Sequence, residues 1–255
     1  MPLFKMKKVW DYCTYNKAFF FVILLLFCIW NALQQYASSK NIVIYLFIFL
    51  INCMVLGYGL TITRDVINGG IRLPKIMIKN VVVLGIKSII VYLIYFFVQA
   101  IILGVISNPL NFPEFDLEDL LLQLPETIKL FFSHSPADAF IFIVLGAIVF
   151  YITTFFMEIA LARLADTGDI KSAFNLKGIK RDIDLLGWKH YVKDFTLIIL
   201  AIVIFSYFTA IYFEIDIINY IWDVFWMLLV FVTQYWGIGV IYSEIKEKKS
   251  HLVES

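Results

Sequence analysis

Four aspartates lie in the longest polar stretch of the chain, which runs from Arg163 to Tyr191. They are Asp166, Asp169, Asp182 and Asp184. Carboxylate oxygens hold divalent cations beside phosphate groups, so this cluster suggests a metal-assisted reaction on a phosphorylated substrate. In a chain this apolar, the corresponding hypothesis is a membrane-embedded enzyme that modifies a lipid or an isoprenoid.

The rest of the sequence does not complete a catalytic site. The pair Ala162-Arg163 resembles part of the signature of phospholipid-synthesising phosphotransferases, but the preceding Asp-Gly and the later aspartates at fixed helical spacing are missing. HExxH, GxSxG and Walker-type glycine motifs are also absent from the sequence. The histidines are scattered and the three cysteines form no CxxC pair: His134, His190 and His251; Cys13, Cys28 and Cys53. We therefore predict no catalytic residue, no metal site and no bound cofactor.

Polar residues inside apolar segments are a second lead, because polarity within a membrane is costly and often functional. Glu158 falls near the inner end of one segment, within reach of Arg163 or Lys87, and Asp223 falls one turn inside the outer end of another. Hydrogen bonding between helices is the simpler interpretation. Transport of a small solute is the alternative, and it requires Glu158 or Asp223 to line a cavity.

The composition places these residues in a membrane protein. The chain is 62% hydrophobic and 16% charged, with a mean hydropathy of +0.86, whereas soluble domains are about 45–50% apolar and about 25% charged. The apolar runs are continuous rather than alternating, which favours helices over barrel strands. These features predict an all-α polytopic helix bundle that forms a single integral membrane domain. A net charge of +1 does not suggest a nucleic-acid partner.

Six transmembrane helices are predicted, at about residues 18–37, 42–63, 84–107, 137–161, 195–213 and 219–242. The apolar run of the first, 18–33, is short, and residues 34–37 could complete the span. Because Ala37-Ser38-Ser39 resembles a cleavage site, a cleaved signal peptide is an alternative to an uncleaved signal anchor. An acidic loop at 108–136 contains a short amphipathic helix that Asp116 can cap, and we expect it to lie on the outer membrane surface or to cover the end of the bundle.

Basic residues predict the orientation. All of the 21 Lys and Arg residues except Lys40 and Lys129 fall in four places: the N-terminal region, the passages between spans two and three and between spans four and five, and the C-terminal tail. The positive-inside rule then places both termini and both passages in the cytoplasm, and the even number of spans agrees. The predicted location is the cytoplasmic membrane.

The two cytoplasmic passages share an order of features. The first contains Arg64, Gly70-Ile71-Arg72 and Leu84-Gly85-Ile86-Lys87, and the second contains Arg163, Gly168-Asp169-Ile170-Lys171 and Leu186-Gly187-Trp188-Lys189. This order favours a parallel repeat in which spans two and three correspond to spans four and five. If Lys87 corresponds to Lys189, residues 76–86 form an interfacial lead-in helix and Lys87 lies at the headgroups.

Amphipathic segments with basic edges occupy the second passage. Asp169 can cap a short first helix, and residues 179–192 predict a second helix with an apolar face. Such helices lie at the inner headgroup layer. The residues predicted to contact lipid headgroups or a partner are Lys171, Lys177, Lys180, Arg181, Trp188 and Lys189.

The segments GYGLTITRDVINGGIRLPK, EIALARLADTGDIKSAFNL and LGWKHYV, in this order, resemble an uncharacterised membrane-protein family. It is the family catalogued as domain of unknown function 4013, common in methanogenic archaea. The resemblance covers spans two to five and departs from the pattern at Lys75, where an acidic residue is expected. It implies a multi-pass archaeal membrane protein and implies no reaction.

The leading functional interpretation is a non-enzymatic membrane scaffold or permease-like bundle that contacts lipid headgroups, with membrane lipids as its partners. The lipid- or isoprenoid-modifying enzyme and the small-solute transporter are the alternatives. They depend, respectively, on the aspartates of the second passage and on the polar residues inside the spans.

Overall fold

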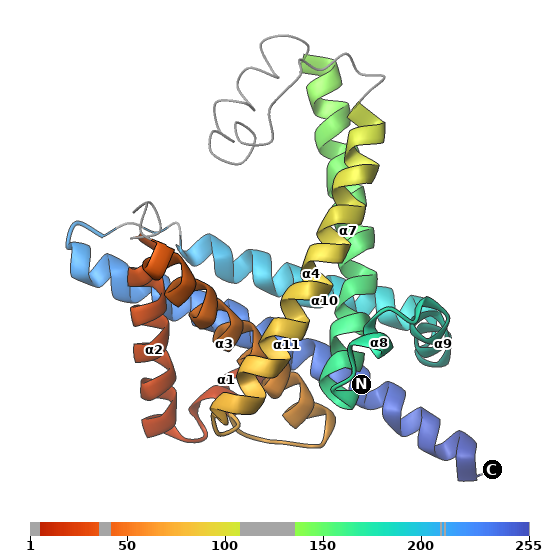
Figure 1. The fold of residues 1–255 in the computed structure, drawn as a ribbon, viewed down its shortest axis with the longest axis horizontal. Helices are drawn as coiled ribbons and strands as arrows, with labels where there is room; N and C mark the ends of the chain where they lie inside the picture. The colour runs from red at the N-terminus through yellow and green to blue at the C-terminus, as the bar shows by residue number, and fades with distance from the viewer. Residues whose placement is uncertain (1–5, 36–41, 108–135, 210, 212, 255) are drawn as a thin grey trace. The chain divides into compact units, whose positions relative to one another are not determined.

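The computed structural model describes residues 6–35, 42–107, 136–209, 211 and 213–254. Every regular element in these residues is a helix, so the predicted all-α class is confirmed (Figure 1). The helices are α1 (Met6–Thr14), α2 (Lys17–Gln35), α3 (Ile42–Ile67), α4 (Ile78–Ser107), α7 (Pro136–Thr167), α8 (Ile170–Ala173), α9 (Leu176–Leu186), α10 (Trp188–Thr209) and α11 (Asp216–Glu254). Several predictions lie outside the described residues: the helix that Asp116 caps, His134, the Ala37-Ser38-Ser39 site, Lys40 and Lys129.

Five of the described helices are long and apolar enough to cross a membrane: α3, α4, α7, α10 and α11. The pair formed by α1 and α2 would be a sixth, although the two helices are bent by 93° relative to one another. Large apolar side chains such as Val43 and Leu46 on α3 and Val203 on α10 are more than half exposed. Exposing so much apolar surface to water would cost too much free energy, so lipid must cover it. The chain is a polytopic helical membrane protein.

The chain divides into two compact units. One comprises residues 1–91 and 158–255, and the other comprises residues 92–157. In the second unit, a Cβ atom on Gly146 of α7 would lie 3.8 Å from Leu103 of α4. The hydroxyl of Thr153 donates to the backbone carbonyl of Val149 at 2.8 Å, which satisfies it within its own helix. The candidate site described below belongs to the first unit.

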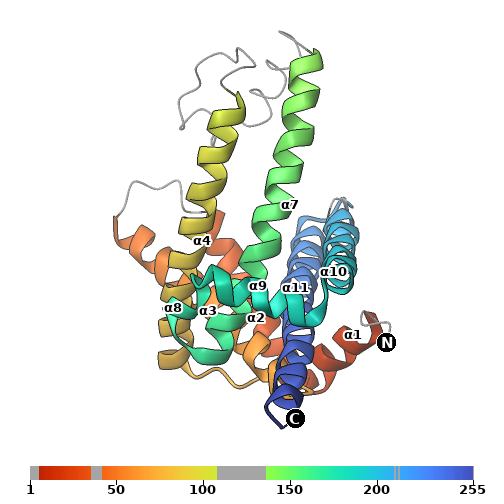
Figure 2. The ribbon, with the colours of Figure 1, turned by 90° about the vertical axis from the view of Figure 1, so that its right-hand side faces the viewer.

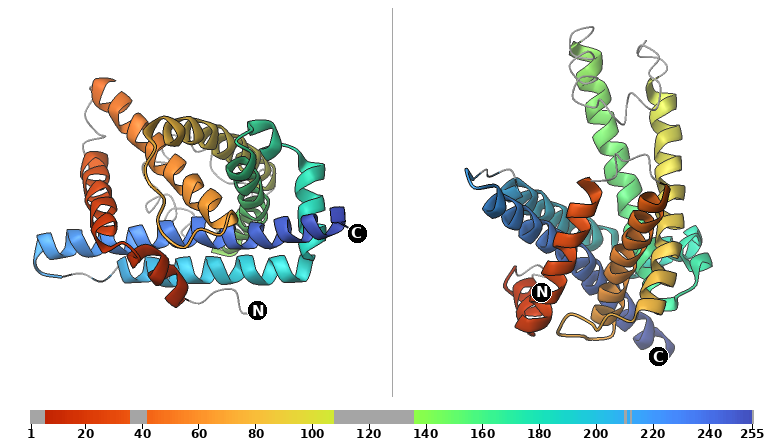
Figure 3. Two further views of the ribbon diagram at one scale, coloured as in Figure 1. Left: turned by 90° about the horizontal axis from the view of Figure 1, so that it is seen from below. Right: turned by 60° about the vertical axis from the view of Figure 1, so that its left-hand side comes forward.

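Helix α11 is the central element of the first unit. In its most apolar stretch 61% of the residues are buried, against 28% for α3 and for α10. Helices α10 and α11 lie side by side, as Figures 1 and 3 show. Helix α3 also packs on α11: the Thr63 hydroxyl donates to the backbone carbonyl of Tyr235 at 3.0 Å, and Gly59 lies against the Tyr235 ring.

Two glycines let α3 and α4 approach closely. A Cβ atom on Gly57 would overlap the carbonyl oxygen of Val81, and one on Gly85 would overlap the carbonyl oxygen of Cys53. The contact is therefore between backbones, which is the way small residues promote helix association in membranes.

Several helices extend beyond the predicted spans. Helix α4 begins at Ile78 and passes through Lys87 without a break, so the predicted lead-in helix and the span are one element. Helix α11 continues to Glu254, although its apolar segment ends near Tyr242. Helix α1 lies in the polar N-terminal region and buries Cys13, which is 1% exposed. The Tyr12 hydroxyl ties α1 to α3 by donating to Asp65 at 2.9 Å.

Candidate functional site

Residues 163–193, which we call the cap, comprise the end of α7, helices α8 and α9, and the first turns of α10 (Figure 2). Capping side chains close in sequence start the two short helices of the cap. The Asp169 side chain accepts from the backbone N–H of Lys171 at 3.1 Å, which confirms that Asp169 is the N-terminal capping residue of α8. The Asn175 side chain accepts from the N–H of Gly178 at 2.9 Å and starts α9.

The second predicted helix, 179–192, is wrong in its bounds. Helix α9 covers Leu176–Leu186, and α10 begins at Trp188. The break is at Gly187, whose φ of 97° lies in the region that favours glycine. Its N–H donates to the carbonyl of Ile183 at 2.8 Å and so satisfies the last turn of α9.

A buried aspartate joins the cap to the rest of the unit. Asp182 lies on the buried face of α9 and is 0% exposed. Its Oδ2 is 2.5 Å from Nη1 of Arg163, and its Oδ1 is 2.7 Å from Nζ of Lys249. Arg163 also donates to the carbonyl of Ser172 at 2.9 Å. A Cβ atom on Gly178 would lie 2.7 Å from the Arg163 guanidinium, so a larger residue there would displace this side chain.

Three lysines at the end of α11 form a second group of contacts, which we call the lysine clamp. Lys246 pairs with Asp166 at 2.8 Å and donates to the Asn68 side chain at 3.2 Å. Lys248 donates to the backbone carbonyls of Leu185 and Leu186, the last residues of α9, at 3.2 and 3.1 Å. Lys249 pairs with Asp182.

Sequence reasoning missed the lysine clamp and described this region only as a short charged tail. One signal was available. Neither proline nor glycine occurs after Gly239, so nothing in the sequence ends the helix before the lysines. The identity of their partners could not be predicted, because those partners lie at least 60 positions earlier in the chain.

Two basic residues of the first passage donate hydrogen bonds to backbone carbonyls at the end of α7. Arg64 donates to the carbonyl of Asp166 at 3.4 Å, and Lys87 donates to the carbonyl of Gly168 at 2.6 Å. Cations at a helix C-terminus satisfy its free carbonyls and its dipole. Lys87 therefore bonds to a helix terminus, and its predicted position at the headgroups stays a prediction.

The predicted repeat is reflected in one shared turn. Gly69 and Gly168 both have positive φ, 81° and 72°, and follow Arg64 and Arg163 by the same five positions. Gly69, rather than the predicted Gly70, is thus the counterpart of Gly168. The two arginines bind different partners, a helix end and Asp182. The repeat stays a prediction.

The four aspartates each have a separate contact. Asp166 pairs with Lys246, Asp169 caps α8, Asp182 pairs with Arg163 and Lys249, and Asp184 accepts from the Trp188 indole at 2.6 Å. The described residues contain no group of three or more histidine, cysteine or acidic side chains placed to hold a metal ion. Nε2 of His190 lies 3.0 Å from Oδ2 of Asp194 and 3.1 Å from Oε2 of Glu244.

Basic side chains cover the outside of the cap, and we call them the basic surface. The residues are Lys171, Lys177, Lys180, Arg181, Lys189 and Lys193, all of which are exposed. All the basic residues predicted to contact headgroups are among them, and Lys193 is added by the structure. Trp188 and Leu176, 43% and 68% exposed, place apolar side chains among these charges.

The polar residues within the spans do not form one site. Gln234 of α11 donates to Oε1 of Glu158 of α7 at 2.8 Å, and the second oxygen of Glu158 is buried without a hydrogen bond. Arg163 and Lys87, the partners considered for Glu158, are bound elsewhere. Asp223 is 11 positions from Gln234, or about 16 Å along α11.

Replacing Gln234 with leucine should destabilise the protein by about 1–3 kcal/mol, because it leaves the buried Glu158 carboxyl without its donor. Thermal unfolding in detergent measures the effect. The double variant Glu158→Leu/Gln234→Leu is the control, since it removes both polar groups and should recover most of the loss. A double variant no more stable than Gln234→Leu would contradict this account.

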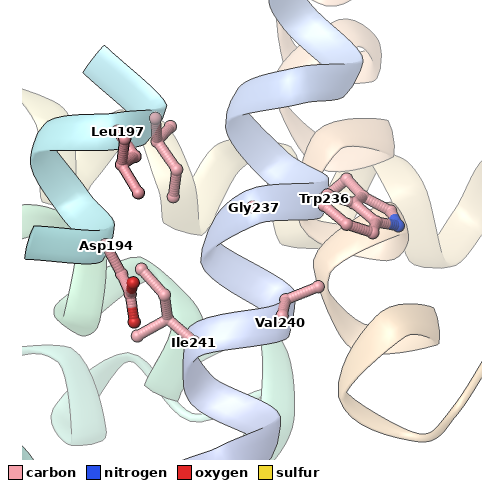
Figure 4. A pocket seen from close by; sticks show the side chains of 7 residues that line it. Asp194, Leu197, Trp236, Gly237, Val240 and Ile241 are labelled. Carbon is pink, nitrogen blue, oxygen red and sulfur yellow. The ribbon is translucent and has the colours of Figure 1, made fainter. Parts of the chain in front are cut away.

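A small pocket lies between α10 and α11 (Figure 4). It is lined by Asp194 and by apolar residues that include Leu197, Trp236 and Val240. Neither Glu158 nor Asp223 lines it.

One protein family matches this chain. The family is described as a protein of unknown function (DUF4013), and its sequence profile matches residues 41–219. The chain belongs to this family. The DUF4013 match contains both passages, Asp182 and the basic surface, while the lysine clamp lies outside it. The resemblance seen in the sequence is thereby confirmed. No curated protein and no solved structure gives a significant match to the chain.

Proposed function

We propose that this DUF4013 protein is a non-enzymatic membrane scaffold whose basic surface contacts the anionic lipid headgroups of the cytoplasmic leaflet. The observation that carries the proposal is the separation of charges in the cap. Its six basic residues from Lys171 to Lys193 are exposed, while Asp182 and, directly after the cap, Asp194 are buried. The two exposed aspartates already accept hydrogen bonds within the cap. Asp169 accepts from the backbone N–H of Lys171, and Asp184 accepts from the indole of Trp188.

The arrangement has the chemistry of a headgroup contact. A lysine or arginine near an anionic leaflet contributes about 1 kcal/mol of binding free energy. Exposed Trp188 supplies an aromatic ring of the kind that anchors proteins at the membrane interface. The cap also follows one membrane-crossing helix, α7, and precedes another, α10, so its position in the chain supports a place at the headgroups.

Reversing three charges on α9 tests the proposal. We expect Lys177→Glu/Lys180→Glu/Arg181→Glu to bind phosphatidylglycerol at least about tenfold more weakly than the wild type, because each substituted residue loses about 1 kcal/mol of attraction. Native mass spectrometry of the purified protein, titrated with short-chain phosphatidylglycerol and phosphatidylcholine, measures both affinities. The affinity for phosphatidylcholine should not change.

The matched control is Lys7→Glu/Lys8→Glu/Lys75→Glu, which changes the net charge equally at three exposed lysines outside the cap. This control should keep most of the phosphatidylglycerol affinity. Equal losses in both triple variants, or none in the α9 variant, would refute a headgroup contact at the basic surface.

A further inference from the structure

The lysine clamp reaches the cap from the far end of the chain. Its three ammonium groups contact the end of α7, the buried Asp182 of α9 and the last carbonyls of α9. We propose that Lys246, Lys248 and Lys249 are positioning residues that hold α9 with its basic face outward. The effect of these lysines on α9 is inferred from the contacts alone. The consequence for lipid binding rests on the proposed function.

Helix α9 depends on tertiary contacts for its position. It has 11 residues, and isolated helices of this length are marginal in water. Its apolar contacts come from Ile179, Ile183 and Leu186, on the same buried face as Asp182. Two of the charged contacts that hold this face, Lys249 to Asp182 and Lys248 to the terminal carbonyls, come from α11.

The lysine clamp and the basic surface occupy different parts of α9. The clamp binds Asp182 and the C-terminal carbonyls, whereas Lys177, Lys180 and Arg181 are exposed on the rest of the helix. The two groups can therefore be changed separately. Removing the clamp should loosen α9, and neutralising the basic surface should not.

Hydrogen exchange measures this difference directly. The full-length protein is placed in nanodiscs that contain phosphatidylglycerol, and amide exchange is followed by mass spectrometry in peptides from residues 176–186. For Lys246→Gln/Lys248→Gln/Lys249→Gln we expect exchange about tenfold faster than in the wild type, because local opening of α9 is less costly. Affinity for phosphatidylglycerol should fall several-fold in the same variant.

Three further variants separate the explanations. Replacing the same lysines with arginine should restore near-wild-type exchange, since arginine can donate to the same acceptors. Lys7→Gln/Lys8→Gln/Lys75→Gln, with the same change in net charge, should leave α9 unaffected. The α9 charge-reversal variant should lose lipid affinity while its α9 exchange stays at the wild-type rate.

An exchange rate in the clamp glutamine variant within twofold of the wild type would overturn the positioning role. Faster exchange with unchanged phosphatidylglycerol affinity would overturn the link to headgroup binding. A wild-type protein without any preference for phosphatidylglycerol would refute the proposed function alone, because the exchange of α9 decides the positioning role by itself.

Discussion

Replacing Gly85 with valine should prevent α3 and α4 from packing and should leave little correctly folded protein. The new Cβ would overlap the carbonyl oxygen of Cys53, and a helix backbone cannot move aside as a side chain can. Overpacking a close contact commonly costs 1–3 kcal/mol, and a clash between backbones should exceed about 3 kcal/mol. The yield of monodisperse protein in size-exclusion chromatography and the unfolding temperature measure the loss.

Gly104, on the same helix, is the matched control. Among the residues that the structure describes, a Cβ atom there would have no neighbour from another helix within 4 Å. We expect Gly104→Val to keep the wild-type yield and to change the free energy of unfolding by less than about 1 kcal/mol, since valine is the better helix former. If Gly85→Val unfolded at the same temperature as Gly104→Val, the close contact of α3 and α4 would be contradicted.

Replacing Asp182 with asparagine is expected to cost about 3–5 kcal/mol of folding free energy, because it leaves the charges of Arg163 and Lys249 without their shared carboxylate. The side chain of Arg163 is 12% exposed, so water can compensate only in part. Thermal unfolding and hydrogen exchange of the cap report the effect, which should be largest in α9.

Two comparisons make the Asp182 result specific. Asp184→Asn changes an exposed aspartate of the same helix and should cost less than about 1 kcal/mol. The triple variant Asp182→Leu/Arg163→Met/Lys249→Met removes all three charges and should be more stable than Asp182→Asn, because no charge is left buried alone. An Asp182→Asn protein as stable as Asp184→Asn would contradict the role of the ion pairs.

These predictions share one structural cause. The charged residues of the cap and of the lysine clamp divide into those that hold the cap in place and those that face outward. Arg163, Asp182 and Lys249 belong to the first group, and Lys177 and Arg181 belong to the second. Substitutions in the first group should lower stability, and substitutions in the second should lower lipid affinity with little change in stability.

The candidate site was predictable in part. The capping of α8 by Asp169 and the exposure of Lys177, Lys180 and Arg181 follow from local patterns, because capping and amphipathicity act over one or two helical turns. The acceptor of Lys87 could not be predicted, for the opposite reason. This acceptor, the carbonyl of Gly168, is 81 positions away and is brought near only by packing of the helices.

The sequence by itself determined the membrane class, the helical content and the family, since long continuous apolar runs can only be satisfied as helices in lipid. The tertiary structure alone decided which charges are buried. Asp182 and Asp184 are two positions apart on one helix, yet one is 0% exposed between two cations and the other faces outward. That difference depends on Arg163, which precedes α9 in the sequence, and on Lys249, which follows it. Both are too far from Asp182 along the chain for a local pattern to predict the contacts.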